Sequence, residues 1–444
     1  MALNDGSLAN DGDFRRVLGT ANPLSSIAKA LEAGESAAII WQGDSTSDES
    51  TEMAYLLFAA LAAKFPDIRA QYKYWSDGSQ AYGAWQVLQA GASGERYIDF
   101  VGDESCTWPA SYMAISGDTD VAAKILPADY TPAATQTLFA RDNGSGTYSQ
   151  RLYLRTDAKL MYGFSQDGTT FTYVTSTAAL PYVEGTPMWV RATHKLNNGA
   201  SGNDVKFYTS SDGEAWSQLG TTVTNVGTVT IYDPGSAVPW EIGAHTQWME
   251  PYIGKIYEVV VRNGIGGPVV SPQPVEAWQR VTAIKNSVGG SPTLYFLNGS
   301  TAGKSLSYFL DTTRHPLIVQ PYEIVSAIVV NDGHNEGALT GRGWYALLDS
   351  LKAANVARAP CAGMVVTTQN PEVVGTANWA RDADRRARQT EMWAIKNGVY
   401  CADTYIDFIR SGVPLLTMMP DGVHPTGSYK NISGDVLIRG SGAT

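Results

Sequence analysis

Between residues 37 and 100 the hydrophobic positions follow the order strand, helix, strand. The run Ala37–Trp41 is apolar without alternation, which is typical of a strand buried on both faces of a sheet. The segment TEMAYLLFAALAAKF (51–65) is rich in strong helix formers, and IRAQYKYW (68–75) has the composition of a further strand. This order predicts a βαβ unit with parallel strands.

From about residue 102 to 267 the pattern changes to short runs with two-residue alternation. The strand candidates QRLYLRT, MWVRATHKL, DVKFYTS and KIYEVVVRN are separated by Asp-Gly and Asn-Gly turns, which predicts an antiparallel sandwich. The motif Ser-x-Asp-Gly-x-x-aromatic occurs twice, at 165–171 and at 210–216. We interpret both copies as hairpin turns with an anchoring aromatic side chain rather than as ligand sites.

The alternation of strands and helices resumes after GGPVVSPQP (266–274), which has the composition of a linker. TLYFLNG, SAIVVNDG and CAGMVVTTQ are predicted strands, and GWYALLDSLKAAN and ANWARDADRRARQTEMWAIKNG are predicted helices. A parallel sheet that is interrupted and then continued is best explained by an inserted domain. We therefore predict an N-terminal segment (1–24), a first α/β part (25–101), an inserted sandwich (102–268) and a second α/β part (269–444).

Charge and cysteine content remove several classes of function. The net charge of −11 over 444 residues argues against nucleic acid and anionic membranes as partners. The three cysteines are far apart and form no CxxC pair, so we expect them to be buried free thiols: Cys106, Cys361 and Cys401. We expect no metal site and no cofactor. The N-terminal residues do not have the pattern of a signal peptide, and no stretch reaches the length of a membrane span.

Two short polar segments follow predicted strands, where open α/β sheets bind ligands. Gly43-Asp44-Ser45 follows the first strand, as a plain strand-to-helix turn or as a turn that presents a nucleophile. In the second interpretation Ser45 lies at a helix N-terminus, where its N–H stabilises an oxyanion. In NGSTAGKS (298–305), Gly303 opens a predicted helix and leaves its N–H free to donate, unless the segment is an ordinary glycine-rich loop. Its glycine spacing is one residue short of a phosphate-binding loop.

Two further segments carry an amide, a carboxylate and an imidazole. In NDGHNE (331–336), Asn335 is either a turn former or a neutral donor to an oxyanion. In MPDGVHPTG (419–427), Asp421 and His424 are three residues apart, in a solvated turn or as a carboxylate that orients an imidazole. The other four histidines are weaker candidates for a catalytic base. His194 and His245 lie in the insert, His315 follows an arginine, and His334 is adjacent to Asn335.

Taken together, the four segments resemble the blocks of the SGNH hydrolases, also called the GDSL esterases. The resemblance covers about residues 25–100 and 270–444 and implies a flavodoxin-like three-layer α/β fold. It implies Ser45 as nucleophile, His424 as general base and acid, and Asp421 as the residue that orients His424. It also implies an oxyanion hole formed by the backbone N–H groups of Ser45 and Gly303 and the amide of Asn335. The chain departs from the family pattern at Glu336, usually Asp, and at Thr46, usually Leu.

The insert resembles the concanavalin A-like and laminin G-like jelly-roll sandwiches in its strand rhythm and aromatic positions. Such domains often bind glycans by stacking aromatic rings on sugars. Five aromatic residues are candidates for stacking, although we expect most of them to pack in the core: Trp108, Tyr130, Trp240, Trp248 and Tyr252.

The resemblances imply a serine esterase that removes O-acetyl or similar short acyl groups from a polysaccharide. The alternative is a glycan-binding adhesin or structural tail protein with a vestigial esterase site; a lipase or thioesterase is a third hypothesis. Joining an esterase to a lectin-like domain resembles phage tail-spike or tail-fibre proteins. We therefore expect a virion or extracellular location, a bacterial surface polysaccharide as partner, and a homo-oligomer, a trimer if the protein is a tail spike.

Overall fold

The computed structural model describes twelve stretches of the chain: 22–102, 105–108, 115, 117–144, 146–235, 237–245, 249–271, 273–280, 287–336, 339–371, 383–421 and 423–430. Two compact units share the chain. One consists of the residues up to Ala92, of Ser291–Val319 and of the residues from Ile324 onwards. The other consists of Ser93–Gly290 together with Gln320–Glu323. The chain is mixed α/β, and the second unit interrupts the first in sequence.

The first unit is built on a mostly parallel sheet. Six strands run parallel in the order β23 (Tyr400–Ala402), β22 (Ala362–Thr367), β21 (Val325–Asn331), β1 (Ala37–Gly43), β20 (Thr293–Asn298) and β2 (Arg69–Ser76). The short strands β3 (Ala81–Tyr82) and β4 (Gln86–Ala90) pair antiparallel with β2. All residues of β1 and β20 are buried. Burial on both faces explains the apolar runs in the sequence.

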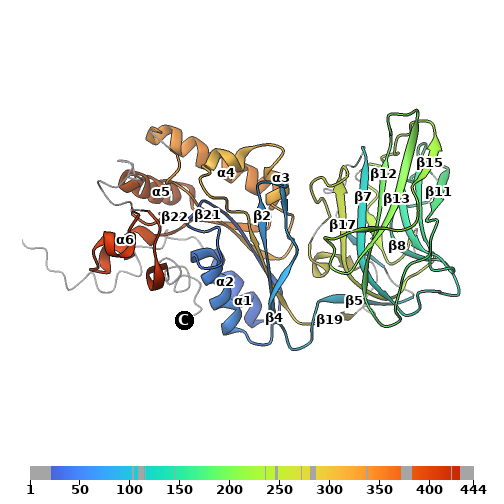
Figure 1. Ribbon diagram of the computed structural model, residues 1–444, viewed down its shortest axis with the longest axis horizontal. Helices are drawn as coiled ribbons and strands as arrows, with labels where there is room; N and C mark the ends of the chain where they lie inside the picture. The colour runs from blue at the N-terminus through green and yellow to red at the C-terminus, as the bar shows by residue number, and fades with distance from the viewer. Residues whose placement is uncertain are drawn as a thin grey trace, which may run out of the picture. The chain divides into compact units, whose positions relative to one another are not determined.

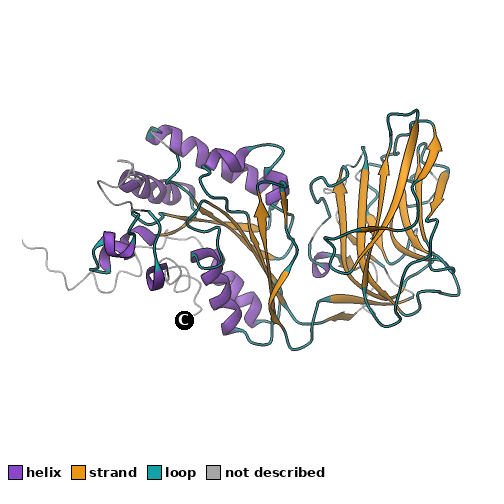
Figure 2. Cartoon of the chain, viewed as in Figure 1, coloured by secondary structure: helices purple, strands orange, loops and turns teal. Residues whose placement is uncertain are grey.

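Helices cover both faces of this sheet (Figures 1 and 2). Helices α1 (Pro23–Glu32) and α2 (Met53–Lys64) lie on one face, and α4 (Gly341–Arg358) and α5 (Ala383–Asn397) lie on the other. The shorter helices are η4 (Leu306–Leu310), α3 (His315–Ile318), α6 (Thr404–Arg410), α7 (Leu415–Met418) and η5 (Gly427–Tyr429). In the part of the chain that the structure describes, no helix is both long and apolar enough to span a membrane.

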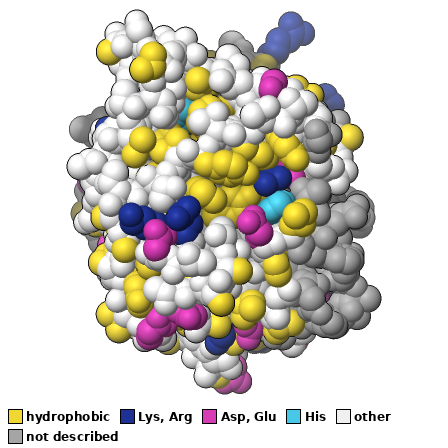
Figure 3. Space-filling view, turned by 90° about the vertical axis from the view of Figure 1, so that its right-hand side faces the viewer, with side chains coloured by type: hydrophobic (Ala, Val, Ile, Leu, Met, Phe, Trp, Pro, Cys, Tyr) yellow, Lys and Arg dark blue, Asp and Glu magenta, His cyan; other side chains and the backbone are white. Residues whose placement is uncertain are grey.

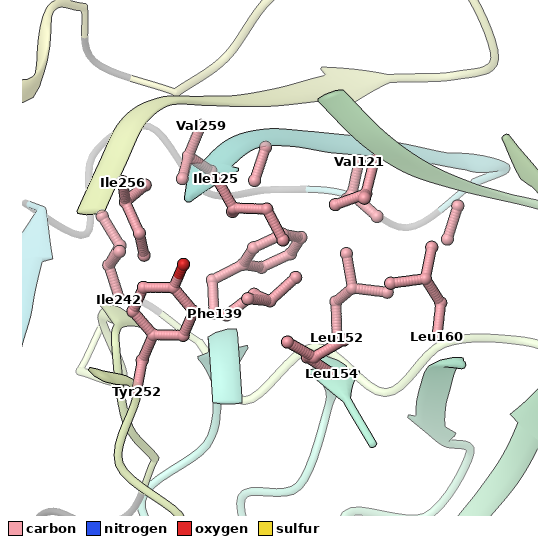
Figure 4. Packing of buried hydrophobic residues seen from close by; sticks show 14 of the residues in the cluster. Val121, Ile125, Phe139, Leu152, Leu154, Leu160, Ile242, Tyr252, Ile256 and Val259 are labelled. Atoms are coloured by element: carbon pink, nitrogen blue, oxygen red, sulfur yellow. The ribbon is translucent and has the colours of Figure 1, made fainter. Parts of the chain in front are cut away.

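The second unit consists of two antiparallel sheets. One has the order β11 (Phe171–Thr175), β10 (Leu160–Ser165), β9 (Gln150–Leu154), β8 (Gln136–Arg141), β16 (Trp240–Ile242), β6 (Cys106–Trp108) and β18 (Gln279–Arg280). The other has the order β14 (Ser217–Gln218), β13 (Gly202–Ser210), β12 (Met188–Lys195), β7 (Thr119–Pro127), β17 (Ile253–Asn263), β5 (Tyr97–Val101) and β19 (Ser287–Gly289), and β15 (Val223–Val226) pairs with β13. Inward side chains of both sheets form one core, in which Val121 and Val259 face Leu152 (Figure 4).

The repeated Ser-x-Asp-Gly motif forms two hairpin turns with the same hydrogen bonds, as predicted. In the turn between β10 and β11, Gly168 N–H donates to Ser165 Oγ (3.0 Å), and the N–H groups that follow Asp167 donate to its Oδ1. In the turn between β13 and β14, Gly213 N–H donates to Ser210 Oγ (2.9 Å). Both glycines have positive φ, 77° and 81°, which explains the need for glycine.

The segment interpreted as a linker (266–274) is part of the second unit. Val269 forms a bridge with Arg262, and the turn η3 (Val275–Ala277) follows. Val275 and Trp278 are 1% and 4% exposed in the core of the sandwich. Glycine and proline content alone cannot distinguish a linker from a segment of a folded domain, because it does not show which of the neighbouring apolar side chains are buried. Cys106 and Cys401 are buried and form no disulfide, as expected, whereas Cys361 is exposed in the turn before β22 and not buried as predicted.

Candidate active site

Three of the four polar segments of interest follow strands that lie next to one another in the parallel sheet, and the fourth, which carries Asp421 and His424, follows helix α7. Trp41 of β1 pairs with Asn298 at the end of β20, and Gly43 at the end of β1 pairs with Asn331 at the end of β21. The carboxyl ends of the three strands are therefore level, and the loops that follow them start from one edge of the sheet. Such an edge is the expected position of a ligand site in an α/β sheet.

The turn that carries Ser45 is fixed by the buried carboxylate of Asp44. Its Oδ1 accepts hydrogen bonds from the N–H (3.0 Å) and the hydroxyl (2.8 Å) of Thr46. The side chain amide of Asn331 donates to Thr46 Oγ1 (2.9 Å), and that of Asn298 donates to the carbonyl of Ser47 (2.7 Å). Neighbouring strand ends therefore hold the turn from both sides, while Ser45 itself is half-buried.

Gly43 allows these loops to approach one another closely. A Cβ atom at this position would lie 2.2 Å from Ser47 Oγ, 2.9 Å from the carbonyl oxygen of Asn331 and 3.0 Å from Ser300 Oγ. Contacts of this length to backbone and buried side chains are too short for any other residue. The first glycine of the Gly-Asp-Ser segment is thus required by packing.

Ser45, His424 and Asp421 form a chain of hydrogen bonds, although Ser45 lies 379 residues before His424 in the sequence. Ser45 Oγ lies 2.7 Å from His424 Nε2, and His424 Nδ1 lies 2.5 Å from Asp421 Oδ2. A carboxylate only accepts hydrogen bonds, so the imidazole donates through Nδ1–H and its Nε2 is left to accept the hydroxyl proton of Ser45. This is the arrangement that turns a serine hydroxyl into a nucleophile.

Asp421 fixes both the imidazole ring and the loop that carries it. Its second oxygen, Oδ1, accepts from the backbone N–H groups of Val423 (3.0 Å) and His424 (2.8 Å). Partial burial acts to raise the pKa of Asp421, but the bonds from the His424 ring and from these two N–H groups outweigh it and lower the pKa to about 2. The carboxylate of Asp421 is therefore ionised at neutral pH.

The structure brings the two remaining oxyanion candidates next to each other. Gly303 lies in a turn with φ of +69°, and Asn335 Nδ2 donates to the carbonyl of Lys304 (3.0 Å). Asn335 is exposed. An amide NH2 group carries two hydrogens, so this bond anchors the side chain beside Gly303 and leaves the second N–H for a ligand.

Two predicted helix starts near the site are wrong. Helix α2 begins at Met53, so Ser45 lies in a turn well before it and gains no support from a helix N-terminus. Gly303 does not open a helix either, because the 3-10 helix η4 begins at Leu306. In both segments, side-chain hydrogen bonds to the backbone compete with helix formation directly after the strand. The carboxylate of Glu336 accepts the N–H of Leu306, which explains a longer residue where the family pattern has Asp.

His334 lies behind the site and does not line it. Its Nε2–H donates to the carbonyl of Asn370 (2.8 Å), and its Nδ1 is 3.9 Å from Asp44 Oδ2. The side chain is 7% exposed, which fits a role in holding the loop. Among the described residues, no group of histidine, cysteine and carboxylate side chains could hold a metal ion.

Sequence reasoning missed three buried amide side chains that hold the site together: Asn298, Asn331 and Gln369. Each lies at or just after the end of a strand, and each donates to the nucleophile turn, Gln369 through a 2.8 Å bond to Asp44 Oδ2. Their signal in the sequence is a polar amide that ends an apolar run. A polar amide in an ordinary turn after a strand gives the same signal, so this signal alone does not identify the residues that hold the site.

The aromatic candidates for sugar stacking are packed in the core of the sandwich, as expected for most of them. Trp108, Tyr130, Trp240 and Tyr252 are at most 1% exposed, so none of the four presents a ring face to solvent. Trp248 lies outside the described residues.

No protein-family model matches the chain, and no curated protein matches it in sequence. Solved structures with a similar backbone include a GDSL-like lipase of Parabacteroides merdae (12% identity over 34% of this chain and 74% of that chain, TM-score 0.30). They also include a peptidoglycan O-acetylesterase (12% identity over 94% of this chain and 95% of that chain, TM-score 0.38). A third is the heptameric SAP-like pentraxin of Limulus polyphemus (18% identity over 44% of this chain and 95% of that chain, TM-score 0.31). The structural neighbours are thus GDSL-like lipases, acetylesterases and a pentraxin, all at low identity and low TM-score.

Proposed function

We propose that this protein is a serine esterase that removes O-acetyl or similar short acyl groups from a polysaccharide through an acyl-enzyme. The observation that carries the proposal is the chain of hydrogen bonds from Ser45 Oγ to His424 Nε2 and from His424 Nδ1 to Asp421 Oδ2. Ester hydrolysis needs a nucleophile, a base beside it and a group that fixes the base, and these three side chains supply them.

In the proposed reaction Ser45 Oγ attacks the ester carbonyl while His424 Nε2 takes the hydroxyl proton. The oxygen of the tetrahedral intermediate accepts from the N–H groups of Ser45 and Gly303 and from the second N–H of Asn335. The tetrahedral intermediate collapses with cleavage of the bond to the sugar oxygen, which takes the proton from His424 and leaves as the alcohol, while the acyl group remains on Ser45. A water molecule, deprotonated by His424, then attacks the acyl carbon; the bond to Ser45 Oγ breaks, His424 returns the proton to Oγ, and the carboxylic acid is released. The carboxylate of Asp421 stabilises the imidazolium in both halves of the reaction.

The open position of the site supports a polymer as the substrate. The side chains of His424 and Asp421 are 38% and 46% exposed, so a long chain can reach the site without entering a closed pocket. The fold that we propose for the first unit is the flavodoxin-like SGNH hydrolase fold, because the nucleophile, glycine and amide segments follow the ends of β1, β20 and β21, and the Asp-x-x-His segment comes after them in the chain. For the second unit we propose a concanavalin A-like jelly-roll.

We propose that the second unit holds the polysaccharide through aromatic rings on the outer side of the sheet that begins with β11, β10 and β9. Figure 3 shows a face of the molecule on which hydrophobic side chains gather, with charged side chains beside them. On this sheet the rings of Tyr148, Phe171 and Tyr173 stack in a row, with centroids 4.7 and 5.4 Å apart. Tyr173 is 47% exposed, and the guanidinium of Arg151 lies 4.2 Å from the Phe171 ring. Arg151 is buried and donates to Asp142, so it holds the Phe171 ring in place, while the exposed ring of Tyr173 offers the apolar surface on which a sugar ring can stack.

This surface also supports the second candidate function, a glycan-binding adhesin or tail protein with a vestigial esterase site. Retention on immobilised polysaccharide tests the surface separately from catalysis. In a Ser45→Ala background, Tyr173→Ala should reduce retention, whereas Val226→Ala, at a side chain that is 99% exposed on the same unit, should not. Equal retention of both variants would contradict the binding surface.

For the biological setting we propose a bacterial surface polysaccharide and a phage tail, with a homo-oligomer, a trimer in a tail spike. The support is the joining of an ester-cleaving unit to a glycan-holding unit in one chain. Detection of the chain in purified virions tests the setting. Mass measurement of the native protein in solution tests the oligomer.

The esterase itself is tested by acetate release from acetylated polysaccharides. Ser45→Ala and His424→Ala should each abolish release while the thermal unfolding of the protein is unchanged. The matched control is Ser350→Ala, which removes an exposed serine hydroxyl that bonds only within α4. Acetate release by Ser45→Ala at the wild-type rate would refute the proposal, and glycan binding without any ester hydrolysis would favour the adhesin.

A further inference from the structure

Gln369 occupies an unusual backbone position at the same edge of the sheet. It follows β22 and has φ of +57°, the left-handed region that side chains other than glycine, asparagine and aspartate rarely adopt. The side chain is 2% exposed. A glutamine in this conformation costs the fold about 1 kcal/mol or more, so its surroundings must hold it there.

The amide of Gln369 joins the ends of three strands. Its Nε2 donates to Asp44 Oδ2 (2.8 Å) beyond β1 and to the carbonyl of Asn331 (3.3 Å) at the end of β21. Its Oε1 accepts from the backbone N–H of His334 (2.9 Å). Both hydrogens and the oxygen of this one amide therefore form hydrogen bonds, and their partners lie in two loops that are far apart in the sequence.

The partners of Gln369 are the neighbours of two reacting groups. Asp44 precedes Ser45, and His334 precedes Asn335. Gly333 leaves room for the amide, because a Cβ atom there would lie 3.0 Å from Gln369 Oε1. A shift of this side chain would therefore move the proposed nucleophile and the proposed oxyanion donor relative to each other.

We propose that Gln369 is a positioning residue that sets the distance between Ser45 and the oxyanion donor Asn335, an inference that rests on the proposed esterase function. It does not touch the substrate. Its contribution is made through Asp44 and His334, so its loss lowers kcat and leaves KM nearly unchanged. A misplacement of reacting groups by about 1 Å costs about 100-fold in rate.

Two substitutions separate positioning from folding. Gln369→Leu keeps the volume and removes all three hydrogen bonds, so we expect kcat to fall about 100-fold. Gln369→Glu keeps the shape but has a donor only when its carboxyl is protonated; ionised, it faces the carboxylate of Asp44. The kcat of Gln369→Glu relative to wild type should therefore rise as the pH falls from about 8 to about 5. The kcat is calculated per folded protein, with the folded fraction measured by thermal unfolding at each pH, so that a purely structural loss would not give this pH dependence.

The experiment measures kcat and KM for a small acetate ester, with wild type, Ser45→Ala, both Gln369 variants and Gln150→Leu. Gln150 is a matched control because it is also fully buried and its side chain accepts a hydrogen bond, from Tyr162, in the other unit. We expect Gln150→Leu to keep wild-type kcat and Gln369→Leu to lose it at constant KM. If Ser45→Ala is inactive but Gln369→Leu keeps kcat within threefold of wild type, the positioning role is overturned. A Gln369→Glu ratio that does not change with pH also overturns it. An active Ser45→Ala protein instead overturns the proposed function and the inference with it.

Discussion

Replacing Asp421 by Asn removes a charge from the site and keeps the shape of its loop. The amide oxygen of Asn can still accept from the N–H groups of Val423 and His424, as Asp421 Oδ1 does. Two things are lost. One is the attraction between the carboxylate and the imidazolium that forms when His424 takes a proton. The other is the acceptor for His424 Nδ1–H, because the amide NH2 group then faces Nδ1 and favours the tautomer that carries its proton on Nε2 and cannot accept the proton of Ser45. The substitution therefore tests catalysis more than folding.

The size of the effect follows from the exposure of the pair. Two unit charges about 4 Å apart attract by about 1 kcal/mol in water and by about 4 kcal/mol at an effective dielectric constant of 20. The side chains of His424 and Asp421 are 38% and 46% exposed, so solvent screens part of the attraction. The charge alone accounts for about 2 to 3 kcal/mol, which corresponds to a fall in kcat of roughly 30- to 150-fold. Because the unfavourable tautomer adds to this loss, we expect kcat to fall by at least this factor.

The assay is the steady-state rate of acetate release near neutral pH, with Asp311→Asn as control. Asp311 Oδ1 also accepts from two backbone N–H groups, those of Thr313 (3.0 Å) and Arg314 (2.8 Å), but orients no histidine at the site. The control should keep full activity. A loss of less than about fivefold in Asp421→Asn would refute the reasoning, because a fully solvent-screened pair would give that value.

Three further changes test the surroundings of the site. Asn335→Ala should lower kcat by about 10²- to 10³-fold without a change in thermal unfolding, measured by ester turnover and calorimetry; a loss below about tenfold would remove it from the oxyanion hole. Gly43→Ala should destabilise the protein by about 2 kcal/mol or more, measured by denaturant unfolding, since its Cβ would lie 2.9 Å from the carbonyl oxygen of Asn331; an unchanged midpoint would contradict the packing argument. Burial raises the pKa of Glu52 to about 7 from its ordinary 4.5, so the fold favours its protonated form and stability declines as the pH rises from 4.5 to 7. Glu52→Gln should therefore match wild-type stability at about pH 4 and exceed it by about 2 kcal/mol at about pH 8, measured by urea unfolding; equal stability at both pH values would contradict the pKa shift.

The strands of the parallel sheet could be predicted because burial on both faces leaves a continuous apolar run. The Asp421–His424 contact could be anticipated for a similar reason, since three residues in a tight loop bring the two side chains together whatever the rest of the fold does. Both signals are local in the sequence. The pairing of Ser45 with His424 is not local, and only the four segments in their order pointed to it.

The remaining parts of the site depend on contacts between strand ends. Gln369 follows the strand in CAGMVVTTQ, and nothing in that segment indicates a positive φ or a partner such as Asp44. Helix α2 begins at Met53 rather than next to Ser45, because the side-chain hydrogen bonds of Asp44 and Thr46 fix a turn after β1, and these contacts are not visible in the sequence. The boundary of the sandwich depended on the burial of Val275 and Trp278, which follow a stretch with the composition of a linker.

The buried polar groups beneath Ser45 link the stability of the fold to the geometry of the site. Asp44, Asn298, Asn331 and Gln369 are at most 2% exposed, and each takes part in a hydrogen bond with another strand end. One such bond contributes only about 1 kcal/mol, but a buried group left without its partner costs about 1 to 3 kcal/mol. A different conformation of the Ser45 turn would leave several of these groups unpaired at once. The network therefore makes alternative turn conformations rare, and it fixes the backbone that carries Ser45, which is the condition for a preorganised nucleophile in the proposed reaction.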